Sequence, residues 1–281
     1  MPESFSNQPH RDLRSPVVNV KTLRRFKKEG RKIVVLTAYD FPTAKILDEA
    51  GVDCLLVGDS AGTVFAGHDT TLPITMDQML FLCSSVVRAT RRALVIGDMP
   101  FLSYQPSVAE AITNAGRFLK EAGAKAVKLE GGLEMCETIA RMVELGIPVM
   151  GHIGLTPQSV NKFGGYKIMG KTPRQKDYML KSAQALEQAG AFAMVLESVV
   201  AEVAKEISET VKIPTIGIGA GVHCDGQVLV ISDMLGLFEE FRPKFVRLYA
   251  DLAPTIRTAV NQFCADVRDG KFPGEAESYE G

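Results

Sequence analysis

Short apolar runs that end in an acid recur along this chain and constrain its fold more than any other feature. Runs rich in β-branched residues lead directly to Asp59, Asp98, Glu130 and Glu197. Such runs, bounded by glycine or charge, are typical of strands buried on both faces of a parallel sheet. Segments with helical spacing, such as residues 107–122, separate most of them. The alternation predicts an α/β fold.

The strand candidates can be counted along the chain. They are residues 33–38, 54–58, 93–97, 126–129, 148–151, 192–196, 214–218 and 228–231. Eight strands alternating with helices in roughly 250 residues is the size of a (β/α)8 TIM barrel. A doubly wound open sheet is the competing fold, but its G-x-G-x-x-G turn is missing after the first strand. We therefore expect one barrel over residues 21–281, preceded by a flexible arm over residues 1–20.

Charge and cysteine content narrow the class of protein. The net charge is −1 and no long basic run appears, which argues against nucleic acid as the main partner. No stretch approaches the ~20 apolar residues of a transmembrane helix, and the N-terminus has no apolar signal region. The five cysteines are scattered and form no C-x-x-C pair, which is typical of a reducing cytoplasm. We expect a cytoplasmic protein that acts on small molecules.

The strand-end acids suggest a metal site. Parallel barrel strands deliver their last residues to one rim, where active sites lie. Asp59, Asp98 and Glu130 end the second, third and fourth predicted strands, so we expect them to be neighbours. Hard oxygen ligands with few His or Cys suit Mg²⁺ or Mn²⁺. The alternative is that some of these acids only cap helices or pair with lysine; Asp40 is interpreted as such a cap.

Three further residues could complete a reaction centre. Lys128 lies two residues before Glu130, so both side chains point the same way; it could hold a substrate carboxylate or simply offset acidic charge. Glu197 follows a very apolar strand, which would raise its pKa toward that of a general base. His152 ends the fifth strand, where we expect it to contact substrate. A divalent metal, a cation and a base suit proton abstraction next to the carbonyl of a 2-oxo acid.

Some segments are longer than plain βα turns require. Residues 61–75 and 153–173 are long enough to act as lids or binding loops. Residues 243–270 form an amphipathic helical region that could close the barrel or serve a subunit contact. His68 and Asp69, in the first of these loops, receive no role.

Several phrases of the sequence together resemble one family. They are LTAYD (36–40), LVGDS (56–60), GHDTTLP (67–73), DMPF (98–101), VKLEGG (127–132), GHIGLTPQSVN (151–161), FGGYK (163–167), GIGAG (217–221), DGQ (225–227) and FPGE (272–275). From about residue 21 to its end, the chain resembles the ketopantoate hydroxymethyltransferases. It departs from the family pattern before residue 21, at 222–224 and at 238–242.

The resemblance implies a TIM barrel of the phosphoenolpyruvate/pyruvate superfamily type. It also implies transfer of a hydroxymethyl group from 5,10-methylenetetrahydrofolate to 3-methyl-2-oxobutanoate, which gives 2-dehydropantoate for pantothenate and coenzyme A synthesis. Family members form ring-stacked homo-oligomers, usually decamers. By this resemblance the Mg²⁺ ligands are Asp59, Asp98 and Glu130, the 2-oxo acid contacts are Asp59, Ser60, Asp98 and Lys128, the proton acceptor is Glu197, and His152 and Tyr39 are pocket positions.

Two other functions remain to be weighed. A Mg²⁺-dependent 2-oxo acid lyase or aldolase of the same superfamily would share the metal site but would not need folate. A barrel kept only for binding or assembly is expected to have lost a ligand or the base, and this chain retains all of them.

Overall fold

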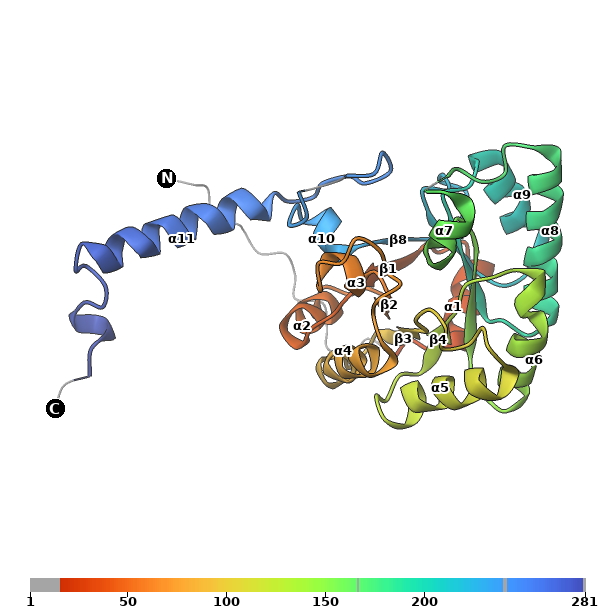
Figure 1. Cartoon of the computed structure of the whole chain (residues 1–281), viewed down its shortest axis with the longest axis horizontal. Helices are drawn as coiled ribbons and strands as arrows, with labels where there is room; N and C mark the ends of the chain where they lie inside the picture. Colours follow the sequence, from red (N-terminus) through yellow and green to blue (C-terminus); the bar gives the residue numbers. More distant parts are fainter. Residues whose placement is uncertain (1–15, 166, 240–241, 280–281) are drawn as a thin grey trace. The chain divides into compact units, whose positions relative to one another are not determined.

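The computed structural model describes residues 16–279 except 166 and 240–241. Its centre is a closed barrel of eight parallel strands (Figure 1). The strands are β1 (Ile33–Thr37), β2 (Cys54–Val57), β3 (Leu94–Asp98), β4 (Ala126–Lys128), β5 (Val149–Gly154), β6 (Ala193–Glu197), β7 (Thr215–Ile218) and β8 (Gly226–Leu229). Each strand pairs with the next in sequence, and β8 pairs with β1. The predicted TIM barrel is confirmed.

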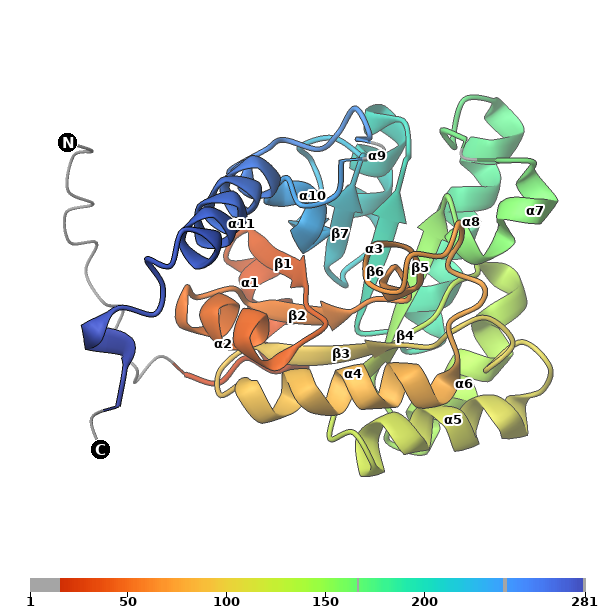
Figure 2. The same ribbon diagram turned by 60° about the vertical axis from the view of Figure 1, so that its left-hand side comes forward.

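Helices follow most of the strands and surround the barrel (Figures 1 and 2), although among the described residues no helix separates β7 from β8. In the part that holds the barrel they are α1 (Val20–Lys28), α2 (Phe41–Glu49), α3 (Ala61–Val64), α4 (Met76–Ala89), α5 (Val108–Lys120), α6 (Cys136–Glu144), α7 (Val160–Phe163), α8 (Pro173–Gln188) and α9 (Ala201–Thr210), with the 3₁₀ turns η1 (Leu133–Met135) and η2 (Pro157–Ser159). Asp40 caps α2 by accepting a hydrogen bond of 2.8 Å from the Thr43 amide, as its interpretation as a cap predicted.

Most of the strands are buried on both faces, except that Val34 of β1 and Gln227 of β8 are exposed, and the alternation of side chains positions the site. Leu94 and Ile96 of β3 belong to the apolar cluster inside the barrel. Gly97, between Ile96 and Asp98, lies where a side chain would point to the opposite face of the strand. A Cβ there would overlap the Phe118 ring of α5. Because side chains alternate along a strand, Asp98 lies on the same face of β3 as Ile96, at its carboxyl end. The strand period therefore directs this acid to the mouth of the barrel.

Several predicted boundaries shift. The eighth strand begins at Gly226 rather than 228, since Gly226 pairs with Ile33 of β1 and a glycine is a poor strand signal. The long segments predicted at 61–75 and 153–173 contain α3, η2 and α7, so they are partly helical. Of the helical region predicted at 243–270, α11 covers Leu252–Arg268.

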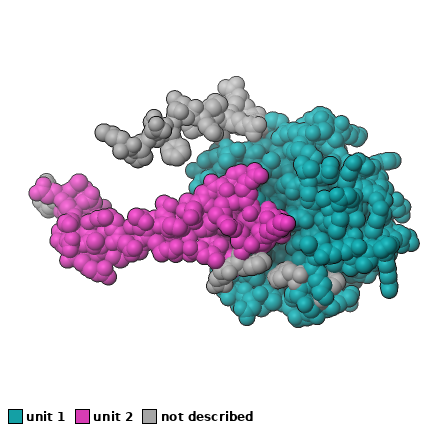
Figure 3. Space-filling model, turned by 90° about the horizontal axis from the view of Figure 1, so that it is seen from above, with its two compact units in different colours: residues 1–230 teal, residues 231–281 magenta. Residues whose placement is uncertain are grey.

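The chain divides into two compact units, coloured separately in Figure 3. The first ends at Val230 and holds the barrel; the second, from Ile231, holds α10 (Ile231–Met234), α11 and the turn η3 (Glu275–Glu277). The single domain expected over residues 21–281 stays a prediction.

The arm predicted over residues 1–20 lies largely outside the described residues. Near its end, Val18 is buried in the core cluster and its amide donates a 2.8 Å hydrogen bond to the Arg92 carbonyl. Asn19 then caps α1 through the amides of Lys21 and Thr22. Among the helices of the described residues, none has the length and apolar character needed to cross a membrane.

Candidate active site

Three buried acids and one lysine gather at the carboxyl ends of β2, β3 and β4. Asp98 and Lys128 are the last residues of their strands and are paired in register, so their side chains are neighbours. Lys128 Nζ lies 2.8 Å from Asp98 Oδ1, and both side chains are almost completely buried. Asp98 Oδ2 accepts a 3.0 Å hydrogen bond from the Asp59 amide. Strand register thus brings together residues that are 39 positions apart in sequence.

The cluster holds more acidic than basic side chains. Burial raises the pKa of Asp98 to about 7, although Lys128 opposes that shift. Burial raises the pKa of Glu130 well above its ordinary value, and Asp59 adds to the effect. Burial alone would lower the pKa of Lys128, but Asp98, Glu130 and Asp59 together raise it. The lysine is therefore an ammonium that faces several carboxyl groups, a surrounding with an excess of acid.

His152 was expected to end the fifth strand, but β5 continues to Gly154, so His152 lies within the strand, close to both Lys128 and Glu197. Lys128 Nζ lies 3.2 Å from His152 Nδ1. Burial, and then Lys128, lower the pKa of His152 well below its ordinary value, so the ring is neutral. An ammonium can only donate, so Nδ1 accepts and the ring proton is on Nε2. Nε2 lies 3.3 Å from Glu197 Oε2 but is not hydrogen-bonded to it, and it is buried without a hydrogen-bond partner among the described residues.

Glu197 is the last residue of β6 and pairs with Gly154 of β5. Burial raises its pKa to about 8, with Lys128 opposing that shift and Asp59 adding to it. Gly154 has φ +101°, and a Cβ there would overlap the carbonyl oxygen of Glu197. The backbones of β5 and β6 therefore approach closely at these two residues, which fixes the position of the Glu197 backbone. The predicted base is thus an acid whose pKa lies near neutral pH, the range that suits a general base.

Tyr39 and Ser60 form a second polar pair on the same rim. Tyr39 follows β1 and is buried, and its hydroxyl lies 2.9 Å from Ser60 Oγ. Ser60 directly follows Asp59 in the chain. The structure therefore brings Tyr39, after β1, next to the predicted substrate contact Ser60, after β2. His68 and Asp69, which received no role, are both exposed.

The donor chemistry of the cluster fits a divalent cation. Glu130 Oε1 is buried and has no hydrogen-bond partner in the described part of the chain. Asp59, Asp98, Glu130 and Glu197 face a single ammonium, so added positive charge offsets an excess of acid. No three His, Cys, Asp or Glu side chains among the described residues are already gathered as a metal cage. Mg²⁺ does not require one, because it is usually held by one or two carboxylates and keeps several waters.

Sequence reasoning missed two buried residues that touch this cluster. Gln158, in η2, donates from Nε2 to Asp59 Oδ2 at 2.9 Å, and its amide donates to Glu130 Oε2 at 3.0 Å. The Tyr104 hydroxyl donates to Gln158 Oε1 at 2.7 Å. Gln158 lies in the phrase at 151–161 that carried the resemblance, which was the only signal for it. Nothing in the sequence pattern singled out Tyr104.

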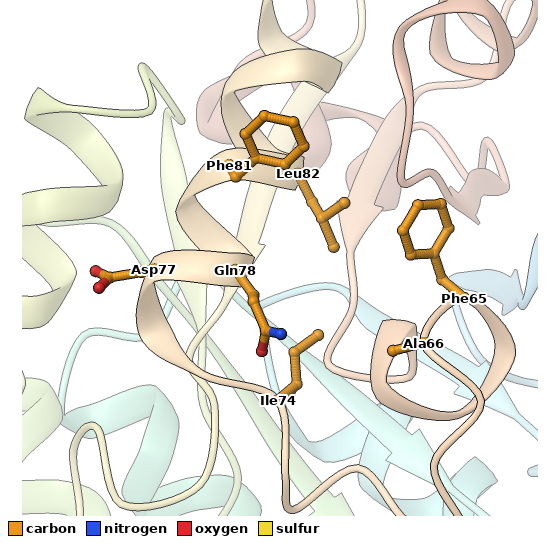
Figure 4. Close-up of a pocket in the computed structure, with 7 residues that line it drawn as sticks. All are labelled: Phe65, Ala66, Ile74, Asp77, Gln78, Phe81 and Leu82. Atoms are coloured by element: carbon orange, nitrogen blue, oxygen red, sulfur yellow. The ribbon is translucent and has the colours of Figure 1, made fainter.

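A pocket of about 410 Å³ lies elsewhere on the barrel unit, between α4 and the segment after α3 (Figure 4). Its lining is mostly apolar: Phe65, Ala66, Ile74, Asp77, Gln78, Phe81 and Leu82. Asp77 points away from the phenyl ring of Phe65 (Figure 4) and forms an ion pair with Arg117 at 2.7 Å. None of the buried acids described above lines this pocket, so it is separate from the candidate site.

Comparison with solved structures defines the class of this barrel. A phosphonopyruvate hydrolase, solved in complex with oxalate and Mg²⁺, superposes with a TM-score of 0.59 at 14% identity, covering 93% of each chain. A 2,3-dimethylmalate lyase of the PEP mutase/isocitrate lyase superfamily gives a TM-score of 0.59 at 18% identity, covering 92% of this chain and 90% of that one. The chain is therefore a TIM barrel with the fold of that superfamily.

Sequence comparison defines the family within this class. The model of the ketopantoate hydroxymethyltransferase family matches residues 17–275. The 3-methyl-2-oxobutanoate hydroxymethyltransferase of Trichlorobacter lovleyi is 55% identical over 262 residues, covering 93% of this chain and 98% of the relative. That of Prosthecochloris aestuarii is 56% identical over 268 residues, covering 94% and 97%. The chain belongs to the ketopantoate hydroxymethyltransferase family, as the resemblance predicted.

Proposed function

We propose that this chain transfers a hydroxymethyl group from 5,10-methylenetetrahydrofolate to 3-methyl-2-oxobutanoate and so forms 2-dehydropantoate, a step toward pantothenate and coenzyme A. Family membership supports the reaction. The observation that carries the chemistry is the buried rim cluster, in which a protonated Lys128 and a Glu197 of raised pKa flank the same neutral His152.

Each residue of the cluster has a role in this proposal. Lys128 holds the substrate carboxylate by charge and Ser60 is a further contact, whereas Asp59 and Asp98 would contact the 2-oxo acid through the cation that they hold. Glu197 takes the proton from C3 of the 2-oxo acid, next to its carbonyl. His152 Nε2 lies 3.3 Å from Glu197 Oε2 and has no hydrogen-bond partner among the described residues, so it is available to contact the substrate. Tyr39 supports Ser60 through their 2.9 Å contact. Burial of these groups excludes water and strengthens every charge interaction among them.

Mg²⁺ is the proposed metal, with Asp59, Asp98 and Glu130 as the residues that hold it. When bound, it would polarise the keto oxygen of the substrate and so stabilise the negative charge that develops there. The support is the set of hard oxygen donors, the unpartnered Glu130 Oε1 and the excess of acid around one ammonium.

The test of the proposed function is exchange of the C3 hydrogen of 3-methyl-2-oxobutanoate with deuterated solvent, followed by NMR. We expect exchange that requires Mg²⁺ and proceeds without folate. Adding 5,10-methylenetetrahydrofolate should then yield 2-dehydropantoate and tetrahydrofolate, with water supplying the hydroxyl of the transferred group. No exchange with any metal would contradict the proposed chemistry. Cleavage of a 2-oxo acid without folate would instead support the lyase or aldolase alternative, which the named relatives do not favour.

The exchange rate should rise with pH. Glu197 is active only as the carboxylate, and its pKa is raised to about 8, so the active fraction grows as pH increases toward that value. A bound cation stabilises the carboxylate, which places the midpoint at or below this pKa. We expect about a tenfold gain per pH unit on the acid limb and then a plateau. An exchange rate that is flat or falls on that limb, in NMR measurements from about pH 5 to about pH 9, would be incompatible with Glu197 as the base.

We further propose a cytoplasmic location and a homo-oligomer, with a decamer as the expected state. The scattered free cysteines support the location. Sedimentation velocity of the full chain would measure the oligomeric state.

A further inference from the structure

Gln158 reaches across the rim from the β5 side to the ends of β2 and β3. It lies in η2 and is 5% exposed. Its Nε2 donates to Asp59 Oδ2 and to the Met99 carbonyl, each at 2.9 Å. One amide group thus contacts two segments that are distant in sequence, since Asp59 is 99 positions and Met99 is 59 positions before Gln158. Its backbone amide adds a third contact, to Glu130 Oε2 at 3.0 Å.

The orientation of this amide is fixed by its neighbours. Its Oε1 accepts from the Tyr104 hydroxyl at 2.7 Å and from Gln105 Nε2 at 3.0 Å. Turning the amide over would set its oxygen against the Asp59 carboxylate and the Met99 carbonyl, which can only accept. All four side-chain contacts are therefore satisfied in one orientation only. A buried network that is fully satisfied is rigid.

Tyr104 closes the network from the other side. It is 1% exposed, and its hydroxyl accepts from the Glu130 amide at 3.1 Å while it donates to Gln158. Two of the three proposed metal ligands, Asp59 and Glu130, are thus tied to one glutamine. Glu130 Oε2 accepts the hydrogen bond from the Gln158 backbone amide. Glu130 Oε1 stays buried without a hydrogen-bond partner among the described residues. The free oxygen is the one a cation could bind.

We propose that Gln158 is a positioning residue for the metal: it holds Asp59 and Glu130 so that each offers one oxygen to the cation, and Tyr104 fixes its amide. This inference rests on the proposed function, because it takes Asp59 and Glu130 as ligands. Groups that orient metal ligands through hydrogen bonds change metal affinity when removed, by about 10- to 100-fold. A glutamine that served only to link the loops would change stability and leave metal affinity unaltered.

The test measures Mn²⁺ binding by the full chain, with free Mn²⁺ counted by electron paramagnetic resonance. Gln158→Leu should bind Mn²⁺ about 10- to 100-fold more weakly, and a high Mg²⁺ concentration should restore most of its rate. Gln184→Leu makes the same change at an exposed position of α8 and should bind like the unaltered chain. Circular dichroism checks that each variant is folded.

The outcomes separate this inference from the proposed function. Folded Gln158→Leu that binds Mn²⁺ within about twofold of the unaltered chain would overturn the positioning role alone. If Gln158→Leu does not fold, Tyr104→Phe decides: it removes only the hydroxyl, and weaker Mn²⁺ binding supports the inference whereas unchanged binding overturns it. An unaltered chain that binds no Mn²⁺ would overturn the cation site itself.

Discussion

Glu197→Gln is expected to abolish exchange of the C3 hydrogen while leaving Mn²⁺ binding intact. The substitution keeps the size of the side chain and removes its ability to take a proton. Loss of a positioned general base lowers the rate by about 100- to 10,000-fold. Exchange followed by NMR at saturating Mg²⁺ measures the effect, and the Mn²⁺ titration shows that the metal site is unchanged.

The arrangement around Glu197 makes this variant informative. His152 Nε2 lies 3.3 Å from the Glu197 carboxyl group without a hydrogen bond between them, so an amide of the same size breaks no hydrogen bond at this contact. The variant should therefore fold and bind substrate normally. Glu209→Gln, the same change at an exposed position of α9, is the matched control and should exchange at the unaltered rate. Retained exchange in Glu197→Gln would assign the base to another residue.

Pairing between neighbouring strands explains how much of this site the sequence could predict. Apolar runs define strands, and in a parallel barrel every strand ends on the same rim, so the amino-acid pattern alone predicts that Asp98 and Lys128 meet. Their 2.8 Å contact follows from the pairing of β3 with β4. Glu130 was expected on the same strand face as Lys128, but β4 ends at Lys128, so the period of two does not place Glu130.

Side chains outside the strands could not be placed in this way. Gln158 lies in a 3₁₀ turn and contacts Asp59 and Met99 through side-chain geometry that no periodic pattern encodes. Tyr104 lies in the segment between β3 and α5, and its hydroxyl contacts only become apparent once both loops are folded. Gly226 was missed as a strand residue for a related reason, because its pairing with Ile33 closes the barrel and depends on the whole chain.

Lys128→Met should cause the largest loss of stability among single substitutions in the cluster. Lys128 is the ammonium that the Asp98 carboxyl group contacts at 2.8 Å, and both side chains are buried. Removing one partner of a buried ion pair leaves an uncompensated charge and costs about 3–5 kcal/mol in the free energy of unfolding. Urea unfolding of the metal-free chain, followed by circular dichroism, measures the loss. Lys181→Met breaks an exposed pair with Asp177 on α8 and should cost less than about 1 kcal/mol.

The pH dependence of that loss identifies its cause. Burial already raises the pKa values of Asp98 and Glu130, and removing the ammonium raises them further. An acid whose pKa is raised by folding destabilises the fold above that pKa, and the penalty is relieved as pH falls and the group takes up its proton. The stability deficit of Lys128→Met should therefore shrink as pH is lowered from about 8 to about 5. A deficit that does not change over this interval would point to lost packing of the lysine chain instead of uncompensated charge.

The double variant Lys128→Met, Asp98→Asn separates stability from function. Replacing both partners removes the charge that Asp98 would leave uncompensated, although Asp59 and Glu130 remain, so part of the lost stability should return. Activity should not return, because the 2-oxo acid would lose both the ammonium that holds its carboxylate and a proposed metal ligand. Recovery of stability without recovery of C3 exchange would mean that the buried pair serves the substrate. Recovery of both would show that Lys128 only offsets acidic charge, the alternative that the sequence left open.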